Sequence, residues 1–255
     1  MAHANEDEAV RLLVQAQRAG GHSKIDPAAL AGLDRAGAYR VMLAQQEALG
    51  EEVGLYKTSL MQPDGTGIIA PIWRSRVGTS PDFCLPTASY AVKGLEFEVG
   101  VRLGRDVPAG EGVDEAAVAS AVASYFVGIE IVGTRLGEPT AGKQLGPAAG
   151  LADNLSALGY VFGGEFARGT DVDGLEVSFE LDGRVLDKRM AKPGFGAVLT
   201  SVVAYARAQH PDMPLKAGTV ITPGSVNGCI LLPPGSKGRV VGRLGSDTTV
   251  EFTLS

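Results

Sequence analysis

The chain has 255 residues, a formal net charge of −6 and 45% hydrophobic residues. This length and composition predict a globular protein with one sizeable core, or a large domain with a smaller appendage. The acidic charge and the lack of a dominant Lys/Arg cluster argue against a nucleic-acid binder. No apolar run is long enough to span a membrane, and the polar, acidic N-terminus is unlike a signal peptide. We therefore expect a cytoplasmic protein without a membrane partner.

The N-terminal part of the chain is predicted to be helical. A stripe of apolar residues predicts a helix over residues 5–20, and Asp26-Pro27 is typical of the start of a short helical segment. A second long helix is predicted over residues 34–49 and ends at Gly50.

From Val53 onward, short β-type runs alternate with turns rich in glycine and proline. Two helices are expected to interrupt the strands, at about 114–124 and 195–209. The fold class is therefore α+β, with a helical α/β region at residues 1–80 and a β-rich domain at residues 81–255. The predicted strands are 54–60, 83–92, 95–103, 126–134, 175–181, 220–225, 238–244 and 248–254.

Three carboxylates stand where the strand pattern requires apolar side chains. Glu96 and Glu98 share one strand, and residues i and i+2 of a strand point to the same face. Glu130 interrupts a nearly continuous apolar run, which is typical of a buried strand. Burial of unpaired anions is costly, and a hard divalent cation such as Mg²⁺ or Mn²⁺ removes that cost. The alternative is a solvated edge strand whose glutamates face water, and Glu130 disfavours it.

The sequence offers few residues for other catalytic chemistries. Its histidines are His3, His22 and His210, which is too few for a probable zinc hydrolase or Ser-His-Asp triad. No nucleophile elbow, phosphate loop or dinucleotide fingerprint is present. Cys84 and Cys229 lie far apart in the sequence, and we expect small buried apolar residues rather than a disulfide.

The strand that holds Glu96 and Glu98, with Leu103-Gly104-Arg105-Asp106-Val107-Pro108 after it, resembles the hydratase/decarboxylase branch of the fumarylacetoacetate hydrolase superfamily. The resemblance runs from about residue 35 to the C-terminus. It implies a mostly-β body of the fumarylacetoacetate hydrolase type, a smaller helical N-terminal region and a homo-oligomer. The further matching segments, in order, are Ala38-Tyr39-Arg40-Val41, Tyr56-Lys57-Thr58-Ser59-Leu60, Ile129-Glu130-Ile131-Val132-Gly133-Thr134-Arg135, Ala152-Asp153-Asn154-Leu155-Ser156, and Leu215-Lys216-Ala217-Gly218 leading to Pro223-Gly224-Ser225.

The resemblance assigns Glu96, Glu98 and Glu130 to a divalent metal and Lys57 to the active site. Lys57 is then the candidate for proton transfer or for binding the negative charge of the substrate, and the alternative is a structural lysine that pairs with an acid. Asp153 is the second catalytic candidate, because it could orient Lys57 or a water molecule. Its alternative role is a helix cap, since a helix could begin after it.

Leu60, Arg135 and Ser225 are the residues that we assign to substrate binding. Ser225 follows a glycine in a turn and could donate hydrogen bonds to a substrate carboxylate, and the alternative is a turn without a role in binding. Arg135 could pair with the substrate or with Asp153, and a surface role is the third alternative. The chain departs from the family pattern mainly around this pocket, where Ser59 replaces a glycine of the hydratases. The metal ligands are therefore better supported than the substrate contacts.

The resemblance implies a Mg²⁺- or Mn²⁺-dependent hydro-lyase of aromatic catabolism that takes a small 2-oxo acid. It would hydrate a 2-hydroxy-2,4-dienoate, of the 2-keto-4-pentenoate type, to a 4-hydroxy-2-oxo acid through a metal-stabilised enolate. The alternatives are a decarboxylase of an oxalocrotonate-like 2-oxo diacid, an acylpyruvate C–C hydrolase, or a degenerate member without catalysis. A decarboxylase needs a further cation for the second carboxylate, for which Arg74 and Arg76 are candidates, and a hydrolase would be expected to use a histidine.

Overall fold

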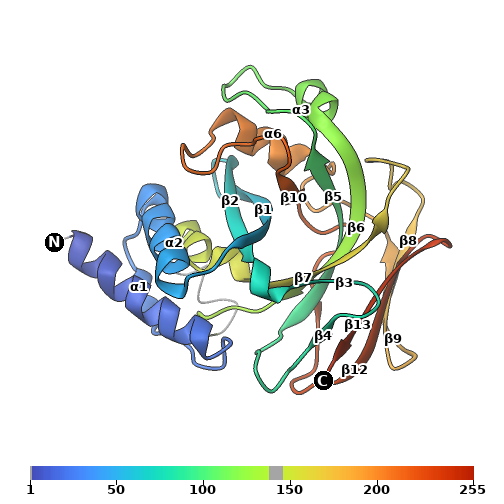
Figure 1. Ribbon diagram of the computed structural model, residues 1–255, viewed down its shortest axis with the longest axis horizontal. Helices are drawn as coiled ribbons and strands as arrows, with labels where there is room; N and C mark the ends of the chain where they lie inside the picture. Colours follow the sequence, from blue (N-terminus) through green and yellow to red (C-terminus); the bar gives the residue numbers. More distant parts are fainter. Residues whose placement is uncertain (1, 138–145) are drawn as a thin grey trace.

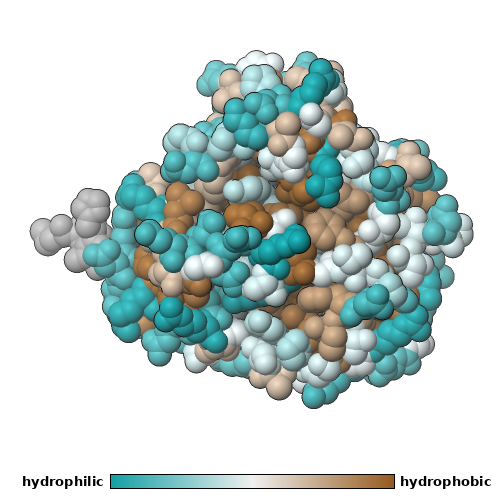
Figure 2. All heavy atoms as spheres, in the orientation of Figure 1, coloured by the Kyte–Doolittle hydropathy of each residue, from teal (hydrophilic) through white to brown (hydrophobic). Residues whose placement is uncertain are grey.

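The structure is a computed structural model that describes residues 2–137 and 146–255. It contains two β-sheets, with the N-terminal helices packed on one side of the larger sheet and the smaller sheet on the other (Figure 1). In the same orientation, apolar side chains gather near the middle of the molecule, and hydrophilic side chains surround them (Figure 2). Within the described ranges, none of the helices has the length and apolar character needed to cross a bilayer.

The N-terminal helices form as the sequence predicts. Helix α1 spans Ala2–Arg18 and packs against α2, Arg35–Leu49. The side chain of Asp34 accepts a hydrogen bond from the Gly37 backbone N–H, which caps the start of α2. Gly50 takes a left-handed conformation with φ of 65° and ends α2. A short 3₁₀ helix, η1 at Pro27–Leu30, stands between the two helices.

The larger sheet has eight strands and curls on itself. Its order is β2-β1-β10-β5-β6-β7-β3, and β11 pairs with β5 beside β10. Strands β2 and β7 contact each other although four strands separate them in this order, so the sheet approaches a closed barrel (Figure 1). The strands are β1 Val53–Met61, β2 Thr66–Trp73, β3 Val77–Thr79, β5 Gly94–Leu103, β6 Val122–Val132, β7 Ala157–Glu165, β10 Val220–Thr222 and β11 Ile230–Leu231.

The smaller sheet has five strands in the order β4-β13-β12-β8-β9, and β13 packs against β6 and β7 of the larger sheet. These strands are β4 Cys84–Leu85, β8 Glu176–Leu181, β9 Arg184–Met190, β12 Gly238–Leu244 and β13 Thr248–Leu254. Helix α6 packs over β1 and β2, and α5 packs against α2. The remaining helical elements are η2 Arg74–Arg76, α3 Glu115–Ala121, α5 Pro147–Ala152, η3 Asn154–Ser156 and α6 Thr200–Arg207.

The α+β class and the mostly-β body are confirmed, whereas several local predictions are wrong. The sequence predicts neither β2 nor β7, and the strand expected at 83–92 is only the two-residue β4. Cys84 and Cys229 are free as expected, but both are exposed rather than buried. Strands β1 to β3 pair in the same sheet as β5 to β7. The division into regions 1–80 and 81–255 stays a prediction.

Candidate metal centre

Strand register places the three predicted metal ligands on one face of the larger sheet. Glu96 on β5 lies directly opposite Glu130 on β6, and Glu98 lies two residues further along β5. Directly opposite residues and i, i+2 residues share a face, so the three carboxylates point the same way. One oxygen from each carboxylate lies within 4.8 Å of the others.

Lys57 reaches this cluster from β1. Its Nζ lies 2.6 Å from Glu130 Oε1 and 3.7 Å from Glu96 Oε2. On β10, which separates β1 from β5, Thr222 is the register partner of Lys57. The structure therefore brings together the lysine and the three acids that the sequence assigns to the active site.

The glutamate side chains have the unsatisfied oxygens that a hard cation would bind. Glu98 and Glu130 are fully buried. Within the described residues, Glu98 Oε1 and Glu130 Oε2 have no hydrogen-bond partner. Buried polar atoms are nearly always paired, and an unpaired carboxylate oxygen is costly. An oxygen-preferring divalent ion such as Mg²⁺ or Mn²⁺ would satisfy both oxygens, so the residues fit the metal implied by the sequence.

The electrostatics of the cluster follow from burial and from like charges. Burial raises the pKa of Glu130 to about 7, although the neighbouring Lys57 opposes this shift. Burial, followed by repulsion from Glu130, raises the pKa of Glu98 well above its usual range. For Lys57, burial acts to lower the pKa, but attraction to Glu130, Glu96 and Glu98 outweighs it and raises the pKa. Lys57 is therefore an ammonium in the metal-free protein.

Two residues that the sequence did not put forward support Glu98. The hydroxyl of Thr222 donates a hydrogen bond to Glu98 Oε2, which leaves Oε1 for a ligand. The Oη of Tyr160 on β7 lies 3.4 Å from Thr222 Oγ1. Gly128 makes room for this ring, because a Cβ there would lie 2.3 Å from Tyr160 Oη. A hydroxyl that fixes a metal ligand also sets its orientation toward the metal.

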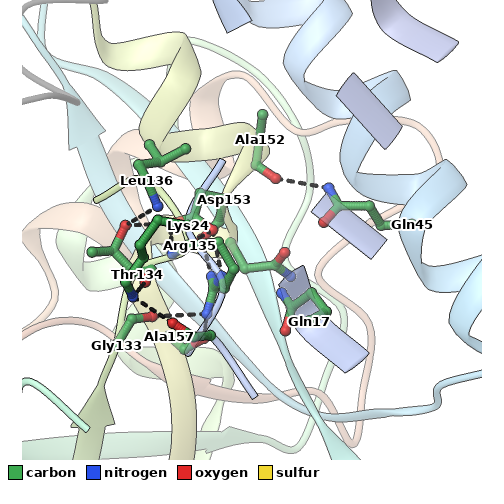
Figure 3. Close-up of polar contacts among 12 residues, drawn as sticks. Gln17, Lys24, Gln45, Gly133, Thr134, Arg135, Leu136, Ala152, Asp153 and Ala157 are labelled. Atoms are coloured by element: carbon green, nitrogen blue, oxygen red, sulfur yellow. Dashed lines mark hydrogen bonds and ion pairs between the residues drawn. The ribbon is translucent and has the colours of Figure 1, made fainter. Parts of the chain in front are cut away.

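Asp153 and Arg135 form a second buried cluster (Figure 3). The Arg135 guanidinium pairs with the Asp153 carboxylate, and both side chains are fully buried. The remaining hydrogen bonds of the Asp153 carboxylate within the described residues come from the Thr134 hydroxyl at 2.7 Å and the Arg135 backbone N–H. The structure thus brings Arg135 to Asp153, which is one of the three interpretations of Arg135 from the sequence, and its full burial shows that the surface role is wrong.

The segment after Asp153 is not the helix start that the sequence allowed. It is the single turn η3, which leads directly into β7. The Leu155 carbonyl of this turn accepts a hydrogen bond from Lys57 Nζ at 3.4 Å. The two predicted catalytic residues, Lys57 and Asp153, are therefore linked by the hydrogen bond that Lys57 donates to the main chain just after Asp153.

The remaining predicted substrate contacts lie in different surroundings. Ser225 is buried beside Glu98, with which it forms an isolated β-bridge, and its Oγ lies 2.9 Å from Asn227 Oδ1. Leu60 is half-buried on β1 and, being three residues from Lys57, faces the other side of the sheet. The assignments of Leu60 and Ser225 to the substrate stay predictions.

The arginines and histidines considered for the alternative reactions differ in their burial and in their contacts. Arg76 is buried and donates to Gln17 Oε1 of α1 at 2.8 Å, and its guanidinium lies 5.2 Å from the centre of the Tyr90 ring. Arg74 is exposed at the end of β2. The His210 ring packs at 4.6 Å from Tyr39. His22 is exposed, and the side chain of His3 lies outside the described part of the structure.

Comparison with known proteins places this arrangement within a fold. No protein-family model matches the sequence, and a search of curated proteins finds no match. The 4-oxalocrotonate decarboxylase from Pseudomonas putida G7, in a structure complexed with magnesium and adipate, is similar over 98% of both chains, with a TM-score of 0.79 and 19% sequence identity.

Two other solved structures are similar over less of this chain. A Yersinia pestis CO92 protein described as of the fumarylacetoacetate hydrolase family has a TM-score of 0.56 and 14% identity, over 79% of this chain and 92% of that chain. The 2-hydroxyhepta-2,4-diene-1,7-dioate isomerase from Mycobacterium marinum has a TM-score of 0.52 and 16% identity, over 78% of this chain and 73% of its own.

The chain therefore has the fold of the fumarylacetoacetate hydrolase superfamily, as the sequence resemblance implied. Within that fold, the similarity to 4-oxalocrotonate decarboxylase extends over nearly the whole of both chains. Because fold alone does not determine a reaction, the chemistry has to be argued from the site.

Proposed function

We propose that the protein is a Mg²⁺- or Mn²⁺-dependent enzyme of 2-oxo acids, and that it decarboxylates a 2-oxo diacid of the oxalocrotonate type. The observation that carries this proposal is the trio of glutamates, two of them fully buried and each of these with one unpaired oxygen, beside the Lys57 ammonium. The full-length similarity to a decarboxylase whose structure contains magnesium and a dicarboxylate supports the choice of reaction.

Glu96, Glu98 and Glu130 would hold the metal. When bound, a divalent metal supplies a Lewis acid that stabilises negative charge on the keto oxygen of a 2-oxo acid. Thr222 keeps Glu98 in place through its hydrogen bond to Oε2. The three carboxylates and the Lys57 ammonium carry a formal charge of −2, which a divalent ion neutralises. The site would then accept an anionic substrate without net repulsion.

Lys57 has two uses in this reaction. Its ammonium lies beside the carboxylates and would attract the negative charge of the substrate. Decarboxylation breaks the bond between the distal carboxylate and its carbon, the electron pair of that bond moves through the conjugated chain to the keto oxygen, and CO₂ leaves. A proton must then reach carbon, and the Lys57 ammonium beside the carboxylates is our candidate for its donor.

Hydration of a 2-hydroxy-2,4-dienoate is the second candidate function, because it uses the same charge stabilisation on the keto oxygen. One observation favours it. A diacid needs a cation for its second carboxylate, but Arg76 is engaged with Gln17, and Arg135 is engaged with Asp153. A substrate with one carboxylate has no such need.

The experiment compares the two substrates in matched assays with purified protein and Mg²⁺. We expect CO₂ release and a monoacid product, identified by mass spectrometry, from the oxalocrotonate-type diacid. EDTA and Glu98→Gln should each abolish this turnover. Loss of diene absorbance with gain of one water from 2-hydroxypenta-2,4-dienoate alone would instead favour the hydratase. Turnover that persists in EDTA would contradict both, and binding without turnover would indicate a degenerate, non-catalytic protein.

The assembly and division of the chain are also proposals. We propose a homo-oligomer, which light scattering of the purified protein tests, and a monomer at all concentrations would contradict it. We propose that the chain divides into a helical α/β region at residues 1–80 and a β-rich domain at residues 81–255 that stay associated, which limited proteolysis tests. The sharing of one sheet by strands from both regions means that cleavage near residue 80 should release neither region under native conditions.

A further inference from the structure

We propose that the buried Arg135–Asp153 pair is a positioning device for Lys57. The pair fixes the turn η3, so that the Leu155 carbonyl faces the Lys57 ammonium. This inference rests on the proposed function, and it makes Arg135 and Asp153 positioning residues rather than groups that touch the substrate.

The turn is in a conformation that it would not hold unaided. Three consecutive residues, Asn154, Leu155 and Ser156, have φ values of 52°, 52° and 61°. Non-glycine residues with an L configuration rarely adopt this left-handed region, and single positions are the rule. Such a conformation persists only where the surrounding structure over-determines it.

The Arg135 guanidinium donates hydrogen bonds to the chain on both sides of the turn. Before the turn, its Nε donates to the Asp153 carboxylate and its Nη2 donates to the Asp153 carbonyl. After the turn, its Nη1 donates to the Ala157 carbonyl at 3.0 Å. The same Nη1 donates to the Gly133 carbonyl at 2.7 Å, which ties the pair to the end of β6 (Figure 3). The planar guanidinium of arginine has N–H donors in fixed directions that match these acceptors, whereas a lysine ammonium would not match them.

Further hydrogen bonds hold the turn against the sheet. The Asn154 side chain donates from Nδ2 to the Pro71 carbonyl on β2 at 3.2 Å. Within the turn, the Ser156 backbone N–H donates to the Asp153 carbonyl at 3.0 Å. The Ser156 carbonyl accepts from the Gly133 backbone N–H at 2.9 Å. The start of the turn is thus attached to β2, and its end is attached to the residue that follows β6, the strand of Glu130.

This arrangement gives Lys57 a neutral hydrogen-bond acceptor, the Leu155 carbonyl. In the metal-free protein the ammonium hydrogen-bonds to Glu130 Oε1 and to the Leu155 carbonyl, which come from different elements. Glu130 would share its charge with a bound metal, whereas a main-chain carbonyl would not. The Leu155 carbonyl therefore keeps the ammonium in place when the carboxylates are engaged.

If the Arg135–Asp153 pair had a purely structural role, its loss would be expected to affect stability alone. Buried ion pairs often contribute little net stability, so a role in folding alone would appear only in the melting temperature. A positioning role must also change the state of Lys57 itself. The test therefore uses a direct observation of the Lys57 ammonium in the metal-free protein, alongside kinetics.

The principal variant is Arg135→Lys, which keeps the positive charge and removes the planar guanidinium group. Arg168→Lys is its matched control, because Arg168 also bonds both the carbonyl and the carboxylate of one aspartate, Asp171, but at the surface. A second variant, Asn154→Gly, keeps the left-handed backbone and removes the bond to Pro71. It tests the same inference if Arg135→Lys does not fold.

The readouts are the proton–nitrogen NMR signal of the Lys57 ammonium, assigned with Lys57→Met, Mg²⁺ affinity by calorimetry, and the separate values of kcat and KM. We expect Arg135→Lys and Asn154→Gly to remove or shift the Lys57 signal through exchange with water. Displacement of a catalytic group can reduce rates by about 100-fold, so kcat should fall by at least about tenfold, and by a larger factor than KM rises. Mg²⁺ affinity should stay at the wild-type value, and Arg168→Lys should match wild type throughout.

The inference is overturned if a folded Arg135→Lys or Asn154→Gly variant retains both the Lys57 signal and kcat. It is also overturned if Mg²⁺ affinity falls in parallel with kcat, since the pair would then act through the glutamates. Because the NMR readout needs neither metal nor substrate, it decides the inference even if the protein turns over no 2-oxo acid.

Discussion

Lys57 and Glu130 lie on strands β1 and β6, which are three positions apart in the larger sheet, and yet Nζ and Oε1 are 2.6 Å apart. Neighbouring strands are about 4.8 Å apart, so the two backbones would be separated by about 14 Å in a flat sheet. The contact exists because the sheet curls (Figure 1). The 2.6 Å contact shows that both side chains project toward each other across the curl. The curl is therefore what assembles the candidate metal centre.

Replacement of Lys57 should separate its electrostatic role from metal binding. Lys57→Met leaves Glu130 buried without its partner, which costs about 3–5 kcal/mol of stability in the metal-free protein. Added Mg²⁺ should restore most of this loss, because the ion supplies the missing positive charge, while activity should stay largely absent. Thermal unfolding with EDTA and with Mg²⁺ measures the effect, and Lys188→Met, at an exposed ion pair, is the control. A Lys57→Met protein that Mg²⁺ cannot stabilise would contradict this.

Glu130 should make the metal-free protein less stable as the pH rises. Its pKa of about 7 in the folded state lies above the ordinary value of about 4.5, so the native state binds the proton more tightly than the unfolded state. The free energy of unfolding should therefore fall between about pH 4.5 and pH 7, relative to Glu130→Gln. Urea unfolding of both proteins in EDTA measures this difference. A difference that does not change with pH in this window would refute the assignment.

Thr222 should contribute to metal affinity without touching the metal. Thr222→Val keeps the shape of the side chain and removes the hydrogen bond to Glu98 Oε2. Loss of such a supporting bond typically reduces metal affinity about 10–100-fold, and we expect a decrease of that size in calorimetric titration with Mg²⁺ or Mn²⁺. Thr249→Val, at an exposed position on β13, should bind like wild type. Equal affinity in the two variants would exclude this role for Thr222.

Cys229 should report metal binding through its reactivity. Although the residue is exposed, its Sγ lies against Gly94 on β5, and partial burial of the thiol, followed by the charge of Glu96, raises the pKa of Cys229 to about 12. A bound dication would cancel the negative charge and lower this pKa. Alkylation of Cys229 at mildly alkaline pH should thus be slow in EDTA and faster with Mg²⁺, with Cys84 as the internal reference in mass spectrometry. An unchanged ratio of the two rates would count against the proposed metal position.

The three glutamates that the structure brings together can be singled out from the sequence because local rules govern them. Strand alternation places Glu96 and Glu98 on one face, and the apolar run around Glu130 marks it as buried. The fumarylacetoacetate hydrolase type of fold also follows from the order of short motifs. Strand β7, which carries Tyr160, was not predicted, although the short, largely apolar run at the start of Ala157–Glu165 is consistent with a buried strand.

The parts that the sequence does not predict depend on long-range geometry. Thr222 meets Glu98 only because β10 lies between β1 and β5, an order that no local pattern specifies. The left-handed turn after Asp153 contains no glycine, and its conformation is imposed by Arg135 from another element. A propensity rule would place such residues in a helix or a strand, and here the tertiary contacts override that preference.

The most direct test of the metal site is anomalous diffraction from crystals grown with Mn²⁺. We predict one strong anomalous peak within coordination distance of one carboxylate oxygen from each of Glu96, Glu98 and Glu130, and its loss in Glu98→Gln. A crystal with saturating Mn²⁺ that shows no peak among these three side chains would contradict the account.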